Sequence, residues 1–161
     1  MAKRRIIFIL VLIAIVLIFS VVALPAMLGG EEYIMEEMER IGDKDIPAAV
    51  YLWLEENKDV EGYGAFYSQG HIYLAARMGR RPTGGYSVLL GDVQGDESVT
   101  VKVQHNSPKP WDIVTQVITY PRTVAKVQCY DEPPTTAIFL GIGDTVLANV
   151  AVVHVDADVG A

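Results

Sequence analysis

The chain has 161 residues, which suits one domain with a tether and is too short for two sizeable cores. Its formal net charge is −7, and three of its 13 basic residues precede a long apolar run. The remainder therefore carries 10 basic and 20 acidic side chains, a net charge of −10. Such an acidic domain repels phosphate backbones and anionic lipid headgroups, which argues against nucleic acid as a partner and for a domain that stands off the membrane surface.

The apolar run, Ile6–Leu24, holds 19 residues with one weakly polar member, Ser20. As a helix it spans about 28 Å, close to the hydrocarbon thickness of a bilayer. The basic cluster ahead of it, Lys3–Arg5, favours an N-terminus in the cytoplasm. We therefore expect a single-pass cell-membrane anchor with the rest of the chain outside. The alternative is a signal segment cleaved after Ala23, which would release a secreted domain.

Two helices are predicted after the anchor. Residues 25–30 form a hinge, and Glu31–Ile41 has the apolar spacing of a stalk or packing helix. Gly42 ends that helix, and the stretch Ile46–Asn57 predicts a second one in which Trp53 is a core anchor. The predicted organisation is an anchor or signal segment over 1–24, a hinge and stalk over 25–45, and a β-rich domain over 46–161.

From Tyr63 onward the apolar residues recur at the spacing of strands rather than helices. This pattern predicts a mainly β fold, a compact antiparallel sandwich or barrel with one or two short helices ahead of it. The core is expected to contain the alternating valines, or their alternating partners if the register is reversed. These valines are Val88, Val99, Val101, Val103, Val117, Val124 and Val127. The predicted strands are Tyr63–Tyr67, Ile72–Arg77, Tyr86–Asp92, Ser98–Gln104, Ile113–Tyr120, Val124–Tyr130, Thr136–Gly141 and Val146–Val155.

No catalytic set is apparent in the sequence. His71, His105 and His154 lie far apart without motif neighbours, and no hydrolase or metalloprotease motif is present. Cys129 is the only cysteine, which rules out an intrachain disulfide and suggests a packing role. We expect no catalytic residues, no metal and no cofactor, and therefore no enzyme.

The most distinctive stretch runs from Gly79 to Val88. Its glycines allow backbone conformations closed to other residues, and Pro82 stiffens the entry. Arg80 and Arg81 place positive charge on an acidic domain and are candidates for surface contact. For Gly84, Gly85 and Tyr86 the ordinary interpretation is a tight loop leading into a core strand.

The stretch Leu74–Val127 resembles the C-terminal domain of the protease complex subunit PrcB family. The resemblance rests on the Gly79–Val88 stretch, the following valine strand, Pro108, the segment Val114–Val117 and Pro121, in that order. It implies a small β-rich envelope protein whose namesake is a lipoprotein accompanying a surface protease. It supplies no catalytic residues, and no lipoprotein cysteine is present here.

A weaker resemblance links two loops to chagasin-type inhibitors of papain-like proteases. Pro82–Tyr86 is similar to their Pro-Thr-Thr-Gly-Tyr loop, and Lys109–Trp111 is similar to their Arg-Pro-Trp loop. The sequence departs from that family at Arg81, where an asparagine is usual, and at Val88, where an aromatic is common. This resemblance implies an inhibitor that inserts loops into a protease cleft.

The leading prediction is a non-catalytic, tethered module that binds a surface or secreted protein, with a protease as the partner that the resemblance implies. The alternative is a loop-mediated protease inhibitor. The inhibitor would use the loops around Gly84–Tyr86 and Lys109–Trp111. The full set of candidate partner-binding residues is Arg80, Arg81, Pro82, Thr83, Gly84, Gly85, Tyr86, Lys109, Pro110 and Trp111.

Overall fold

A computed structural model of the chain describes residues 38–95, 98–129 and 132–155. They belong to one compact unit, Tyr33–Ala161. The predicted anchor Ile6–Leu24 and most of the predicted helix Glu31–Ile41 lie outside the described residues. Within the described ranges, no helix has both the length and the apolar character needed to cross a membrane.

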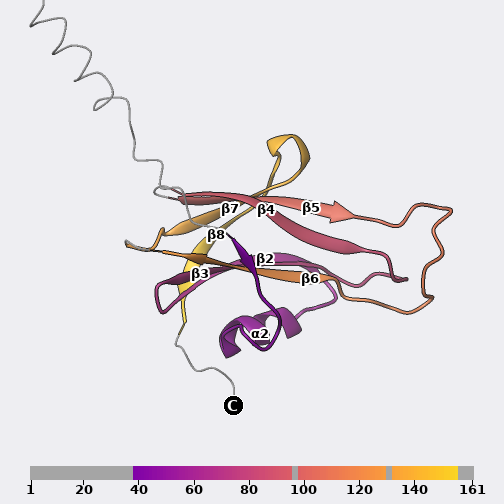
Figure 1. Ribbon diagram of the computed structural model, residues 1–161, viewed down its shortest axis with the longest axis horizontal. Coiled ribbons are helices and arrows are strands. Elements are labelled where there is room, and N and C mark those ends of the chain that lie inside the picture. Colours follow the sequence, from indigo (N-terminus) through magenta and orange to yellow (C-terminus); the bar gives the residue numbers. More distant parts are fainter. Residues whose placement is uncertain (1–37, 96–97, 130–131, 156–161) are drawn as a thin grey trace, which may run out of the picture. The chain divides into compact units, whose positions relative to one another are not determined.

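The described fold is mainly β, as predicted, with one α-helix (Figure 1). The predicted helix Ile46–Asn57 is confirmed in shorter form, and most predicted strands are present within a few residues of their expected bounds. In chain order the elements are β1 (Glu39–Arg40), α2 (Ala48–Glu55), β2 (Glu61–Ser68), β3 (His71–Met78), β4 (Ser87–Gly95), β5 (Ser98–Asn106), β6 (Arg122–Gln128), β7 (Thr136–Leu140), a 3-10 turn η1 (Ile142–Asp144) and β8 (Val146–His154).

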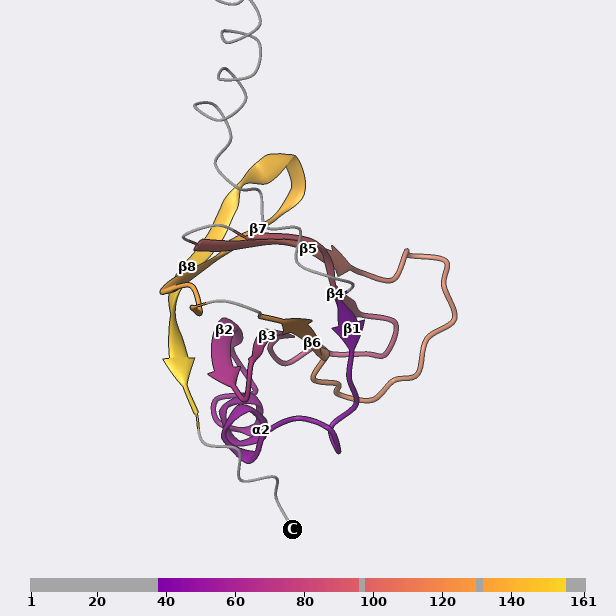
Figure 2. The same cartoon turned by 60° about the vertical axis from the view of Figure 1, so that its left-hand side comes forward.

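The strands form a single sheet in the order β1-β6-β3-β2-β8-β7-β5-β4 that curls into a half-barrel (Figure 2). The long strand β8 turns the corner, because residues 146–151 pair with β7 and Val152–His154 pair with β2. The two edge strands approach each other where Arg40 Nη2 lies 3.5 Å from the carbonyl oxygen of Leu90. The sheet therefore encloses a core between its two halves, intermediate between the predicted sandwich and barrel.

The expectation of a purely antiparallel sheet is wrong, since β2 pairs with β8 and β5 pairs with β7 in parallel. The cause is the route of the chain. After β5 it crosses to the other half of the sheet as β6, and it returns to enter β7 in the same direction as β5. Parallel neighbours need such a crossover connection, whereas antiparallel neighbours can be joined by a hairpin.

The main core lies inside the curl around the fully buried Phe139. Val88, Val99, Val101, Val103 and Val127 are buried there as predicted, and Val124 is buried in the second cluster beneath α2. The assignment of Val117 to the core is wrong because 58% of this residue is exposed. Cys129 packs against the edge of the main core.

Helix α2 covers the outer face of β2, β3 and β6. Strand β3 is consequently buried on both faces: Leu74 points into the main core and Tyr73 packs under the helix. Arg77 ties the end of the helix to the sheet, since its guanidinium donates to the carbonyl oxygens of Trp53 and Glu56 and lies 4.1 Å from the Trp53 ring. Trp53 is thus half-buried between helix and sheet, as expected for an anchor.

Two predicted elements are replaced by other structure. Glu39 and Arg40, expected in the helix Glu31–Ile41, form β1 because they pair with Lys126 and Ala125 of β6. The predicted strand Ile113–Tyr120 is absent, and Thr119 alone makes an isolated bridge, to Arg81. That stretch instead belongs to a long exposed loop.

Candidate functional site

Two loops meet at one end of the half-barrel. The short loop (residues 79–86) joins β3 to β4, and the long loop (residues 107–121) joins β5 to β6. They share this end because β3 and β5 finish there, while β4 and β6, their antiparallel neighbours, begin there (Figure 1). A loop as long as residues 107–121 with no helix or strand of its own is often functional in a compact domain. All ten predicted partner-binding residues lie in these two loops.

Backbone hydrogen bonds hold the loops together. Arg81 and Thr119 exchange two of them, with nitrogen–oxygen distances of 2.9 and 3.0 Å. Gly84 N–H donates to the carbonyl oxygen of Thr115 at 2.9 Å, and Thr119 Oγ1 donates to the carbonyl oxygen of Thr83 at 2.8 Å. The sequence could not show this contact, because the two loops are separated by two strands.

Gly85 is required by close packing as well as by conformation. Its φ is +84°, and a Cβ at this position would lie 2.9 Å from Val114 Cγ1 and 3.1 Å from Pro108 Cβ. At Gly84 a Cβ would lie 2.4 Å from Thr115 Oγ1, although its φ is not in the left-handed region. Both glycines therefore let the short loop lie directly against the long one.

The two arginines have different environments. Arg81 is partly buried, with its guanidinium 5.7 Å from the Tyr86 ring and 3.9 Å from a Glu61 carboxylate oxygen. Tyr86 is half-buried against the main core, so Arg81 and Tyr86 chiefly support the loop. Arg80 is exposed and has no ion pair among the described residues. Of the two, Arg80 is available to a partner.

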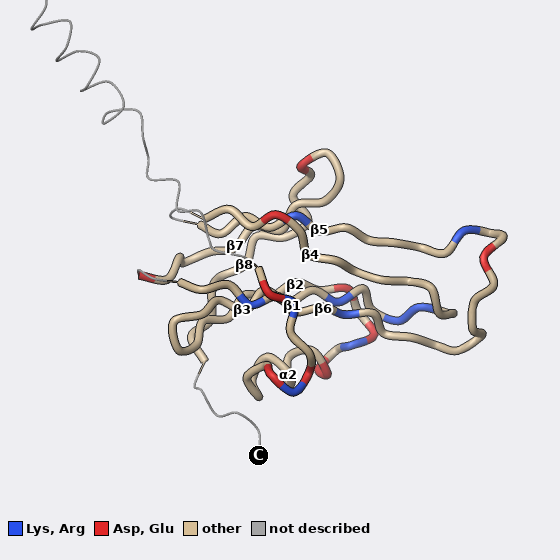
Figure 3. The backbone as a smooth tube through the Cα atoms, viewed as in Figure 1, with Lys and Arg blue, Asp and Glu red and all other residues tan. Residues whose placement is uncertain are grey.

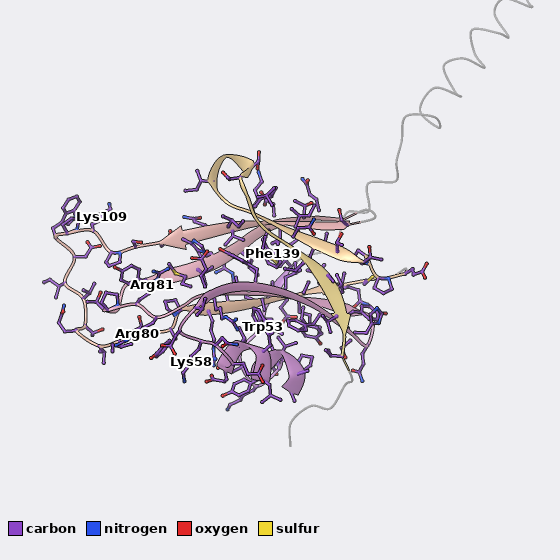
Figure 4. All side chains as sticks on the ribbon, turned by 180° about the vertical axis from the view of Figure 1, so that it is seen from behind. Trp53, Lys58, Arg80, Arg81, Lys109 and Phe139 are labelled. Carbon is purple, nitrogen blue, oxygen red and sulfur yellow. The ribbon has the colours of Figure 1, made fainter. Side chains whose placement is uncertain are left out.

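The long loop presents Trp111 at its outer end. Trp111 is 76% exposed, and Lys109 Nζ lies 5.8 Å from its ring. A tight turn orients them, because the Lys109 N–H donates to Asp112 Oδ2 at 2.8 Å and the Asp112 N–H donates to the carbonyl oxygen of Lys109. Lys109, Pro110 and Trp111 are all exposed (Figure 4 labels Lys109 at this end together with Arg80 and Arg81).

The sequence interpretation missed the apolar residues that follow Trp111. Ile113 is 103% exposed, and Val117 and Ile118 are exposed as well. A usable signal was present: in Ile113–Tyr120 the apolar residues come in adjacent pairs and do not alternate as in a half-buried strand. Adjacent exposed apolar side chains of this kind mark interaction surfaces.

The charge of this end differs from that of the rest of the protein. The two loops contain three basic residues, Arg80, Arg81 and Lys109, and one acidic residue, Asp112, a net charge of +2 in a chain of −7. Figure 3 shows basic residues on both loops. The two loops are therefore basic segments of an acidic protein, and their exposed cations Arg80 and Lys109 suit a partner that carries acidic groups.

A polar network lies where the short loop meets the sheet. The Tyr63 hydroxyl donates to Glu61 Oε1 at 2.6 Å and lies 3.3 Å from His105 Nε2. Burial, followed by the hydrogen bond to Glu61, raises the pKa of Tyr63 far above its ordinary value, so the phenol stays protonated. The network joins β2 to β5 across the curl.

The other histidines also lie beside tyrosines, His71 near Tyr73 and His154 near Tyr67. Within the described ranges, no group of three or more His, Cys, Asp or Glu side chains is placed to hold a metal ion. A hollow of about 470 Å³ lies between β4, β5 and η1, where Lys102 and Asp144 form an ion pair at 3.5 Å. It contains none of the predicted site residues.

The chain is a β-rich module whose two loops present exposed apolar and basic side chains at one end, the loop end. Residues 72–128, from β3 to the end of β6 and including both loops, match the family model described as PrcB C-terminal. This match confirms the resemblance to the PrcB C-terminal domain over residues 72–128. No curated protein and no solved structure matches the chain.

Proposed function

We propose that this protein is a non-catalytic, membrane-tethered module that binds another envelope protein, as an accessory subunit of a surface protease complex. The observation that carries the proposal is the loop end itself. A PrcB C-terminal domain here presents exposed apolar side chains beside cations that lack ion pairs within the described chain. The family suggests association with a protease complex and an accessory role without catalysis.

The composition of the loop end supports protein recognition. Trp111 supplies a large exposed aromatic side chain, the type most often found at energetic hot spots of interfaces. Ile113 and Val117 extend the apolar surface, and Arg80 and Lys109 supply a charged rim. An apolar centre with a polar rim is the usual anatomy of a protein–protein interface.

The tether and the location outside the membrane rest on the sequence. The run Ile6–Leu24 and the preceding basic cluster favour an anchor with its C-terminal domain on the extracytoplasmic side. A C-terminal alkaline phosphatase fusion tests this topology in cells, since the enzyme is active only outside the cytoplasm. An inactive fusion at normal abundance would contradict it.

Affinity capture with the full-length chain in detergent tests the partner. A protease or protease subunit from envelope extract should be recovered by the wild type. Ile113→Ala should reduce recovery about tenfold, whereas Ile142→Ala, a matched change at a residue 87% exposed on η1, should leave it unchanged. An equal loss of recovery with both variants, or no loss with either variant, would mean that the partner contacts another surface.

A chagasin-like inhibitor is the second candidate, favoured by one observation: the short loop adjoins the long loop that carries exposed Trp111. Half-buried Tyr86 counts against it, because an inhibitory loop needs that ring at the cleft. Titration of papain with the full-length chain decides the matter. Inhibition that Trp111→Ala relieves would support this function, and unaltered papain activity would reject it.

A further inference from the structure

The segment Ile113–Ile118 of the long loop has strand-forming residues but no strand. Five of its six residues are β-branched, and Gln116 is the exception. Each has a negative φ, so no residue adopts a left-handed conformation that would oppose pairing. The segment nevertheless touches the fold mainly through Thr115 and Val114, which lie against the short loop.

Its backbone donors are unpaired. Among the described residues, none of the N–H groups of Ile113–Ile118 donates to a backbone or side-chain acceptor. The Thr115 carbonyl accepts from Gly84 and so faces the short loop. In a paired strand the groups of the next residue point the opposite way, so Gln116 would present its backbone groups to an incoming strand once the segment is extended. An exposed row of such groups is a template for another strand.

Charge decides which strand this edge fits. The two loops together carry a net charge of +2, so a second copy of the same edge would bring like charges together. Arg80 and Lys109 have no ion pairs among the described residues, and carboxylates of an incoming chain can pair with them. The apolar side chains of Ile113 and Val117 favour alternate apolar residues in that chain.

We propose that the partner contributes an extended acidic segment, which adds as a β-strand along Ile113–Ile118. Main-chain hydrogen bonds supply the part of the affinity that does not depend on the partner's sequence. Ion pairs between carboxylates of the segment and Arg80 and Lys109 supply selectivity. The proposal rests on the protein-binding function above and adds its mode of recognition. The strand that the sequence predicts at Ile113–Tyr120 would then form only in the complex.

The first test uses the full-length chain in detergent and a peptide of about seven residues that alternates glutamate with valine, the length of a short strand. Hydrogen exchange, read residue by residue, should slow at Ile113–Ile118 when the peptide is added. A peptide with lysine in place of glutamate should bind at least about tenfold more weakly. Binding without protection of this segment, no binding, or equal binding of both peptides would overturn the proposal.

The second test is a matched pair of variants at one exposed position. Gln116→Pro removes the backbone N–H that would pair with an incoming strand, whereas Gln116→Thr keeps it and remains strand-forming. Peptide affinity by fluorescence anisotropy should fall at least about tenfold for Gln116→Pro and stay within about twofold for Gln116→Thr. Both variants should fold, because the Gln116 side chain makes one local bond, to the Val114 carbonyl at 3.4 Å. Equal affinities would refute strand addition.

The outcomes separate this proposal from the broader function. If Ile113→Ala disrupts capture of the protease partner but Gln116→Pro does not, protein binding stands and strand addition fails. If the protein dimerises without peptide and Ile113–Ile118 becomes protected from hydrogen exchange in the dimer, a second copy pairs with this segment and the acidic-segment proposal is wrong. Binding to anionic vesicles that competes with the peptide would likewise assign the surface to a membrane.

Discussion

Gly85→Ala should destabilise the protein through the contact between the two loops. At φ +84° an alanine costs about 1–2 kcal/mol relative to glycine. Its Cβ would also lie 2.9 Å from Val114 Cγ1 and 3.1 Å from Pro108 Cβ, and over-packing of this kind costs about 1–3 kcal/mol. The expected total loss in the free energy of unfolding is about 2–5 kcal/mol, a large part of the stability of a single domain.

Gly143→Ala is the matched control for the steric part of that loss. Its φ is +69°, and a Cβ there has no neighbour within 4 Å, so only the conformational cost of about 1–2 kcal/mol applies. Equilibrium urea unfolding of both full-length variants in the same detergent measures the difference, expected at about 1–3 kcal/mol. Equal losses at the two positions would refute the packing of the short loop against the long loop.

Three further changes test the fold and its electrostatics. Phe139→Ala should lower the free energy of unfolding, measured in urea, by about 3–5 kcal/mol because the ring is fully buried between the halves of the sheet. A loss below about 1 kcal/mol would contradict a closed core. Arg77→Lys keeps the charge but loses the paired hydrogen bonds of the guanidinium to the carbonyl oxygens of Trp53 and Glu56. The free energy of unfolding should fall by about 1–2 kcal/mol. An unchanged free energy of unfolding would mean that these hydrogen bonds do not stabilise the protein. Glu55→Gln tests pH dependence. Hydrogen bonds from Arg122, then Lys58, hold the pKa of Glu55 below its ordinary 4.5, so this group stabilises the fold above that pH and the contribution disappears as the pH falls through the lower folded value. The variant should therefore lose less stability than the wild type between about pH 5 and pH 3. If the free energy of unfolding falls equally with pH in both proteins, the ion pairs of Glu55 do not stabilise the fold.

The three-dimensional arrangement changes the relative importance of the predicted binding residues. Arg81 and Tyr86 support the short loop from within, whereas Arg80, Lys109 and Trp111 are exposed. Alanine at Arg81 would therefore mix structural damage with loss of binding, and Arg80 is the cleaner position at which to remove a positive charge. Changes at Ile113 and Gln116 address the surface that the sequence interpretation overlooked.

The sequence determined the elements whose pattern is local. The alternating valines at Val99, Val101 and Val103 predict a strand with one buried face, and β5 buries all three. Gln69 and Gly70 form the expected hairpin turn, with φ values of +48° and +76°. The apolar spacing around Trp53 similarly identifies α2 before any tertiary contact is known.

Only the tertiary structure decided the elements that depend on distant partners. Glu39 and Arg40 are a strand because β6 offers them an edge, and no local pattern in two residues can signal this. Ile113–Ile118 has high β-propensity but stays a loop because no neighbouring strand within the described chain pairs with it. Strand formation needs a second chain segment to satisfy its backbone groups, so propensity without a partner leaves a surface open to another protein.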